Sequence, residues 1–206
     1  MSYSNFIADL LVESGCYVNA STDENLIQVP TGDLILAYLS CRLLISKVRE
    51  REIIEEMLSE VVQKSFSSDS TVVGIATAGI PWGYGIASRL KLPMLYTRSN
   101  EKGYGLGGLI EGDVTESFSE AILVDDVLYT GSSVISAQKA LEQKNIKTVG
   151  IVCIASLNDK VVEYFREQGI RVIALTNYND ILVSAENRKV LNQEEVNVMK
   201  MFYERR

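Results

Sequence analysis

Two adjacent aspartates, Asp125 and Asp126, follow an apolar run, Ala121–Val124, and precede a turn of small and hydroxyl-bearing residues, Tyr129–Ser133. The apolar run is typical of a central strand in a parallel sheet, and such sheets bind ligands at the carboxyl ends of their strands. The turn would direct backbone N–H groups and hydroxyls at one point ahead of a helix, an arrangement that binds a phosphate dianion. The two carboxylates would then accept hydrogen bonds from the vicinal hydroxyls of a sugar. The pattern therefore predicts a sugar-phosphate site.

The composition excludes several other kinds of chemistry. The chain has 206 residues, a net charge of −7 and no histidine, so it contains neither a Ser-His-Asp relay nor a histidine-ligated zinc site. It also lacks the broad positive field on which nucleic-acid binding depends. Carboxylates, lysine, arginine, backbone amides or a bound ion must therefore carry the chemistry.

The cysteines and the N-terminal residues indicate the compartment. Cys16, Cys41 and Cys153 are far apart and lie in apolar surroundings, which predicts buried thiols in a reducing environment. No lysine or arginine precedes Arg42, so the charged start of a signal peptide is missing, and no apolar run is long enough for a membrane span. We expect a soluble, cytoplasmic protein.

Short runs of β-branched residues alternate with helical periodicity from about residue 70, which predicts an α/β fold with a parallel sheet flanked by helices. The expected strands are Thr71–Thr77, Leu92–Thr97, Ala121–Val124, Thr148–Ala155 and Arg171–Leu175. Helices are expected over Ile45–Val62, around Val134–Leu141, around Val161–Phe165 and over Asn187–Arg206. Residues 1–41 are less regular, and we expect residues 1–45 to form a small N-terminal hood beside a core of residues 70–180, the whole chain 1–206 being one domain.

A glycine-rich segment, Ser99–Phe118, interrupts this alternation. It contains five glycines, follows Arg98 and holds Lys102. Glycine gives the backbone many accessible conformations, and a long loop within a compact domain is often a binding loop. We expect a mobile loop that carries positive charge to a ligand.

Three segments, in this order along the chain, resemble those of the type I phosphoribosyltransferases, and most closely the orotate phosphoribosyltransferase branch. Ala121–Ser133 resembles the family's signature for 5-phosphoribosyl-1-pyrophosphate (PRPP). Gly74–Pro81 is similar to its strand-to-helix loop for pyrophosphate, and Tyr96–Gly105 is similar to its catalytic loop. The resemblance implies a Rossmann-type core and an enzyme that transfers phosphoribosyl from PRPP to a pyrimidine-type base.

The resemblance also implies roles for single residues. It implies PRPP contacts from Thr77, Ala78, Gly79, Arg98, Lys102, Asp125, Asp126, Tyr129, Thr130, Gly131, Ser132 and Ser133. Lys102, Asp125 and Asp126 are the expected catalytic residues. Mg²⁺ is expected through the substrate, with the two aspartates as candidate protein ligands. A homodimer is implied, in which the 99–118 loop closes over the neighbouring site.

The chain departs from the family where the base is expected to bind. Pro30, Asp33 and Leu157 occupy positions where many members have basic residues, and Ser99 and Tyr104 replace a lysine and a histidine in the catalytic loop. Orotate carries a carboxylate that needs a partner, because an unpaired buried charge is costly.

Two alternatives follow for the base. Either it is another pyrimidine-like or neutral base, or a cation such as Lys160 or Arg42 pairs with the orotate carboxylate. Tyr38 and Tyr129 are the candidate base-binding residues. A non-catalytic PRPP or nucleotide sensor is an alternative function, and hydrolysis or synthesis of a ribose phosphate on the same fold is a weaker one.

Overall fold

The computed structural model describes residues 2–19, 27–28, 32, 34–35, 37–98, 109–115 and 117–204. Its internal contacts divide the chain into two compact units. One unit comprises Glu52–Ala174, and the other comprises Met1–Arg51 together with Leu175–Arg206. In the described part of the chain, no helix combines the length and the apolar character that crossing a membrane requires.

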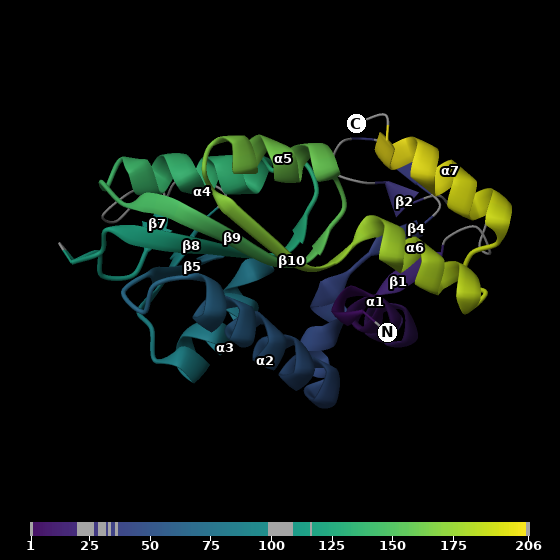
Figure 1. Ribbon diagram of the computed structural model, residues 1–206, viewed down its shortest axis with the longest axis horizontal. Helices are drawn as coiled ribbons and strands as arrows, with labels where there is room; N and C mark the ends of the chain where they lie inside the picture. The colour runs from purple at the N-terminus through teal and green to yellow at the C-terminus, as the bar shows by residue number, and fades with distance from the viewer. Residues whose placement is uncertain are drawn as a thin grey trace. The chain divides into compact units, whose positions relative to one another are not determined.

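A six-stranded sheet forms the centre of the first unit (Figure 1). Its strands are β5 (Thr71–Ile75), β6 (Met94–Thr97), β7 (Ile110–Glu111), β8 (Glu120–Leu128), β9 (Lys147–Ser156) and β10 (Arg171–Asn177). They lie in the order β10-β9-β8-β5-β6-β7. β5 pairs in parallel with β6 and β8, and β8 pairs in parallel with β9. The short strand β7 pairs antiparallel with β6. The carboxyl ends of β5, β6, β8 and β9 therefore meet at one edge.

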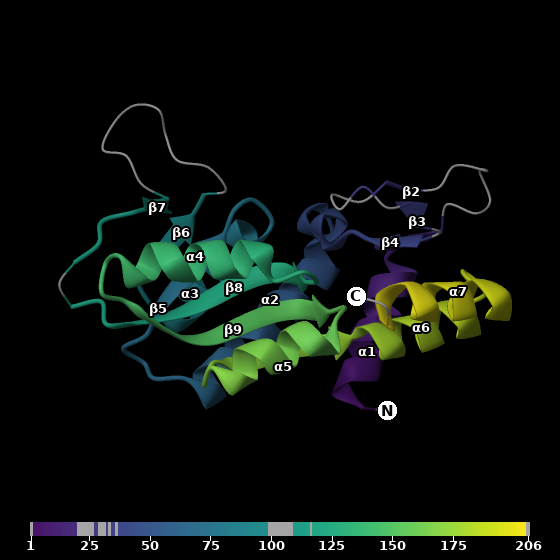
Figure 2. The same cartoon turned by 90° about the horizontal axis from the view of Figure 1, so that it is seen from above.

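Helices cover both faces of this sheet (Figure 1, Figure 2). The helices are α2 (Val48–Ser65), α3 (Gly79–Leu90), α4 (Ser132–Glu142) and α5 (Asp159–Glu167). α4 and α5 lie on one face, where Val134, Ala137, Leu141, Val162 and Phe165 pack into a buried cluster with Val73, Leu123 and Ile151. α3 and α2 lie on the other face. Because helices cover both faces, the side chains of the central strands are buried on both sides of the sheet. This explains why these strands are apolar throughout, the feature from which they were predicted.

The second unit combines short strands with helices. Its elements are α1 (Tyr3–Glu13), β1 (Tyr17–Asn19), β2 (Ile27–Gln28), β3 (Leu34–Ile35), β4 (Ala37–Leu39), the 3-10 helix Cys41–Ser46, α6 (Tyr178–Asn187) and α7 (Gln193–Glu204). Polar contacts join α1 to α6: Ser184 Oγ donates to Asp9 at 2.6 Å, and Arg188 lies 3.2 Å from the same carboxylate. β1 pairs with β4, and β2 pairs with β3, in both cases antiparallel.

The predicted parallel sheet and its flanking helices are confirmed, and each of the five expected strands is present. One helix was missed, and another begins later than expected. Residues 3–13 form a regular helix, in which Ser2 caps the first turn by accepting a hydrogen bond from the Asn5 N–H. The C-terminal stretch is not helical from Asn187; α6 ends there, and α7 begins at Gln193 after a turn. The three cysteines are buried free thiols, as predicted.

Candidate active site

The turn after β5 lies directly against the end of β8. Thr77 and Ala78 precede α3, which begins at Gly79. A Cβ atom on Gly79 would be 2.1 Å from the carbonyl oxygen of Val124 and 3.0 Å from the Cα of Asp125. Such distances leave no space for a side chain, so glycine is required for the close approach. The predicted pyrophosphate turn and the acid pair are therefore neighbours.

The predicted phosphate turn ends in an open helix N-terminus. Gly131 is the N-cap of α4 and adopts the left-handed conformation, with φ of 75°. It has no side chain to cap the helix, and the Ser132 N–H makes only a long contact to Thr130 Oγ1, at 3.4 Å, so the first turn can donate to an anion. The Thr130 and Ser132 hydroxyl oxygens lie 3.0 Å apart at the same turn. This geometry suits a phosphate group.

The acid pair is held by short local hydrogen bonds. Asp125 Oδ1 accepts the Asp126 N–H at 2.9 Å, and Asp126 Oδ1 accepts the Val127 N–H at 2.9 Å. Ser133 Oγ donates to Asp125 Oδ2 at 3.2 Å, which joins the beginning of α4 to the acid pair. The structure thus brings together the residues predicted to bind a sugar and its phosphate.

Burial gives Asp125 an unusual protonation equilibrium. Its side chain is buried, with 8% of the residue exposed. Burial, and secondly the nearby charge of Asp126, raise the pKa of Asp125 from 3.8 to about 7, against the opposing effect of hydrogen bonds from the Asp126 N–H and Ser133. An acid pair with a shifted pKa at the carboxyl edge of a parallel sheet is typical of a functional site.

Arg98 stands at the same edge, at the end of β6. The last residue of β5, Ile75, pairs with Thr97, so Arg98 follows directly beside the predicted pyrophosphate turn. The Arg98 guanidinium lies 3.4 Å from the carboxylate of Glu111, and the Arg98 backbone N–H donates to the Leu109 carbonyl at 2.8 Å. The sequence analysis missed Glu111. Its signal was an acid within the glycine-rich segment, in the short run Ile110–Glu111 that pairs with β6.

A comparison with protein-family models decides the classification. Residues 47–173 match the model described as the phosphoribosyl transferase domain. The chain belongs to the phosphoribosyltransferase family.

Relatives with curated names lie in the orotate branch of this phosphoribosyltransferase family. The chain is 33% identical over 168 residues to the orotate phosphoribosyltransferase of Lactococcus lactis, covering 81% of this chain and 80% of that protein. It is 32% identical to orotate phosphoribosyltransferases of Streptococcus pyogenes, with the same coverage.

Solved structures share the fold. Orotate phosphoribosyltransferase from Aeropyrum pernix aligns with a TM-score of 0.71 at 21% identity, over 89% of this chain and 99% of that one. UMP synthase from Leishmania donovani aligns with a TM-score of 0.81 at 18% identity, over 98% of this chain. This phosphoribosyltransferase spans 42% of that UMP synthase chain.

Several predicted site residues are placed elsewhere or not described. Lys102 and Tyr104 lie outside the described residues, as do Pro30 and Asp33. Tyr38 lies in β4 of the second unit and is half-buried. On the base side, the described residues therefore carry fewer of the predicted contacts than on the phosphate side.

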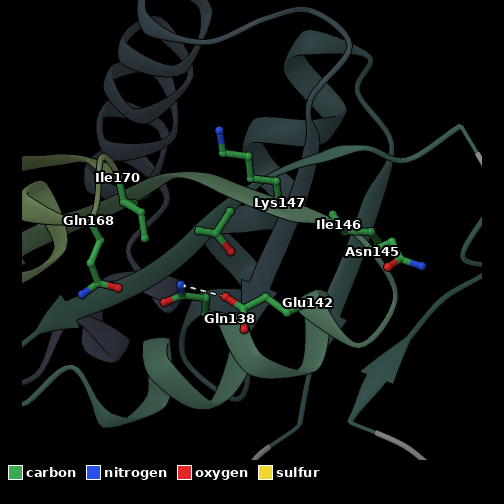
Figure 3. A pocket seen from close by; sticks show the side chains of 8 residues that line it. Gln138, Glu142, Asn145, Ile146, Lys147, Gln168 and Ile170 are labelled. Carbon is green, nitrogen blue, oxygen red and sulfur yellow. Dashed lines mark hydrogen bonds between the residues drawn. The ribbon is translucent and has the colours of Figure 1, made fainter.

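A separate hollow of about 440 Å³ opens near the amino ends of β9 and β10, away from the carboxyl edge (Figure 3). It is lined by Gln138, Glu142, Asn145, Ile146, Lys147, Thr148, Gln168 and Ile170. Its polar groups do not converge. Gln138 donates to Glu142 at 3.1 Å, while Asn145 and Gln168 lie at opposite ends. The groups suited to binding a phosphorylated sugar are those at the carboxyl edge.

Proposed function

We propose that this phosphoribosyltransferase transfers the phosphoribosyl group of PRPP to orotate and releases pyrophosphate. The observation that carries this proposal is the 33% identity, over 81% of the chain, to an enzyme named orotate phosphoribosyltransferase. The prediction of an orotate-type enzyme agrees with these relatives. The alternative of a non-catalytic PRPP sensor has no such support among them.

The proposed reaction exchanges two bonds at one carbon. The C1–O bond to pyrophosphate breaks, and pyrophosphate leaves with the bonding electrons. A ring nitrogen of orotate, which has lost its proton, forms the new C1–N bond and gives orotidine 5'-phosphate. The ribose ring becomes cationic in the transition state, so groups that stabilise the leaving pyrophosphate and the positive ring contribute most to the rate.

The carboxyl edge provides groups for each part of PRPP. The turn Tyr129–Ser133 and the N-terminus of α4 would hold the 5-phosphate, and Asp125 and Asp126 would accept hydrogen bonds from the ribose hydroxyls. The turn Thr77–Gly79 and Arg98 would contact pyrophosphate. The close contact of Gly79 with β8 and the hydrogen bond from Ser133 to Asp125 support this common site, since they join its parts. Lys102 remains the predicted stabiliser of the leaving group.

The donor set fits a substrate-held Mg²⁺. Among the described residues, no group of three or more His, Cys, Asp or Glu side chains could hold a metal ion. Two adjacent carboxylates, with the remaining ligands from pyrophosphate, ribose and water, suit Mg²⁺, which keeps waters and is usually bound through one or two carboxylates and substrate phosphates. Asp125 and Asp126 are the residues that would hold it. When bound, Mg²⁺ would neutralise part of the charge on pyrophosphate.

A cation for the orotate carboxylate is proposed on α5. Leu157 is buried, with 7% exposed, at the position where many members carry arginine. Lys160 lies in the first turn of α5, and its neighbour Val161 is so close to the phosphate turn that a Cβ atom on Gly131 would be 2.9 Å from Val161 Cγ1. We therefore propose that Lys160 pairs with a carboxylate bound beside the sugar. Tyr38 and Tyr129 remain the proposed aromatic contacts of the base.

The assembly and the division of the chain remain proposals from the family resemblance. We propose a cytoplasmic homodimer in which the 99–118 segment closes over the neighbouring site. Residues 99–108 and 116 of this segment lie outside the described residues. The organisation of residues 1–206 as one domain, with a hood of residues 1–45 and a core of residues 70–180, is likewise a proposal.

Pyrophosphate release tests the function. The native protein is incubated with PRPP and Mg²⁺, alone or with orotate, uracil or adenine. Release only with orotate supports the proposal. Release without any base indicates hydrolysis, and PRPP binding without release with any base indicates a sensor. A Lys160→Met variant that keeps its PRPP affinity and its orotate KM would refute the role proposed for Lys160.

A further inference from the structure

Ser132 and Ser133 are neighbours of the same residue type at the start of α4, but their hydroxyls have different partners. Ser132 Oγ lies 3.0 Å from Thr130 Oγ1, within the phosphate turn. Ser133 Oγ donates instead to Asp125 Oδ2 at 3.2 Å. The hydroxyl of Ser133 is thus directed to the acid pair, although the sequence pattern had directed all three hydroxyls to the phosphate.

Both oxygens of Asp125 accept hydrogen bonds from the protein itself. Oδ1 accepts the Asp126 N–H at 2.9 Å, and Oδ2 accepts the Ser133 hydroxyl. The Asp126 N–H bond is local to the strand, whereas the Ser133 bond spans eight residues and comes from another element. Because only 8% of Asp125 is exposed, loss of the Ser133 hydroxyl would remove from Oδ2 a donor that water cannot readily replace. The carboxylate orientation therefore depends on Ser133.

We propose that Ser133 is a positioning residue: its hydroxyl holds Asp125 and couples the 5-phosphate turn to the groups that bind ribose. This role rests on the proposed function, because it requires PRPP to occupy the site. The Ser133 backbone N–H faces the phosphate position as part of the helix N-terminus, while its side chain acts through Asp125. A phosphate bound at the turn then fixes α4 and, through Ser133, the carboxylate that meets the ribose hydroxyls.

A double-mutant cycle tests the contact in the free protein. Ser133→Ala, Asp125→Ala and the double variant are unfolded in urea without ligand. Ser133→Ala is expected to lower the unfolding midpoint when Asp125 is present and to change it little in the Asp125→Ala background, because coupled residues are non-additive. Ser132→Ala, combined with Asp125→Ala in the same way, is the matched control and should be additive. Equal effects of Ser133→Ala in both backgrounds would overturn the proposal.

Kinetics test the positioning role. Ser133→Ala is expected to raise the KM for PRPP by about tenfold, since a hydrogen bond to a charged group is lost, with the KM for orotate unchanged. Ser133→Thr, which keeps the hydroxyl, should restore the KM for PRPP to within about twofold of the native value. An unchanged KM for PRPP in Ser133→Ala, or no rescue by Ser133→Thr, would overturn the role.

Failure of the proposed function can be distinguished from failure of the positioning role of Ser133. If the native protein neither binds PRPP in calorimetry nor releases pyrophosphate, the proposed function fails, and the positioning role fails with it. If the native protein is active but the cycle shows no coupling, only the role of Ser133 fails.

Discussion

Replacing Asp125 by asparagine should make the protein more stable while abolishing PRPP binding. The pKa of Asp125 is raised from 3.8 to about 7 by burial and by the charge of Asp126. The difference between these two pKa values corresponds to about 4 kcal/mol of folding free energy once the carboxyl is ionised. This is the cost of ionising the buried carboxyl above pH 7, and a neutral amide of the same shape avoids it. We take about 4 kcal/mol as the upper value of the gain, because the amide has a single acceptor oxygen, which can keep the Asp126 N–H bond, while its NH2 group cannot accept the Ser133 hydroxyl.

The pH dependence of the free energy of unfolding tests whether Asp125 is destabilising. The raised pKa means that native Asp125 keeps its proton between about pH 4 and pH 7, where the unfolded carboxyl has lost it. Its contribution to stability is therefore complete below about pH 4 and is lost as pH rises through about 7. The difference between Asp125→Asn and the native protein, measured by urea unfolding, should be small at pH 4 and largest at pH 8. Calorimetry at pH 8 should show that the variant has lost PRPP binding.

Asp126→Asn is the matched control. It removes the second cause of the shift, the charge of Asp126, but leaves Asp125 buried, so its gain at pH 8 should be smaller than that of Asp125→Asn. A loss of stability in Asp125→Asn at pH 8, or a gain equal at pH 4 and pH 8, would refute the assignment of Asp125 as a buried, destabilising carboxyl.

Three other expectations concern the same edge. Gly79→Ala places a Cβ atom 2.1 Å from the Val124 oxygen and should lower the free energy of unfolding in urea by more than about 3 kcal/mol. Gly169→Ala, where no atom lies within 4 Å, should lower it by only about 1 kcal/mol, because its backbone is left-handed. Similar losses in the two variants would contradict the crowding at Gly79. Arg98→Ala should raise the KM for PRPP at least about tenfold through loss of a charge-assisted contact. Arg89→Ala, on the surface of α3, should leave this KM unchanged. An equal KM for PRPP in the two variants would argue against a contact between Arg98 and pyrophosphate. Chelation with EDTA should abolish PRPP binding in calorimetry, and excess Mg²⁺ should restore it; binding that persists in EDTA would exclude a required divalent ion.

Residues that act through the backbone were predictable from the sequence. Ala121–Val124 is apolar throughout because β8 is covered on both faces, and Gly131 marks a turn whose backbone must be left-handed. The two strands that are apolar throughout, β8 and β9, lie inside the sheet, as their sequences predict. These local patterns predict the phosphate and ribose parts of the site, and the structure places the residues concerned at one edge of the sheet, where their roles stay predictions.

Side-chain pairings between distant segments were not predictable in the same way. At the start of a helix, the Ser133 hydroxyl could point to the phosphate turn or to the acid pair. It donates to Asp125 because β8 places that carboxylate within reach. Glu111 lies close to Arg98 because β7 pairs antiparallel with β6. β7 has only two residues, so its sequence is too short to show the alternation typical of a strand. α1 was missed although Ser2 is an N-cap and Ile7, Leu10 and Leu11 stand at the spacing of one buried helix face.

The acid pair illustrates why such a site is better explained by ligand binding than by folding. Asp125 occupies a central strand, where an apolar residue would pack without ionisation cost, and its raised pKa shows that the charged form is destabilising there. Its neighbours reduce this cost only in part, by one backbone and one hydroxyl donor. A bound ribose with two hydroxyl donors, together with Mg²⁺, would supply the missing partners. If Asp125 binds ribose as proposed, relief of its destabilised carboxylate would contribute binding energy for PRPP.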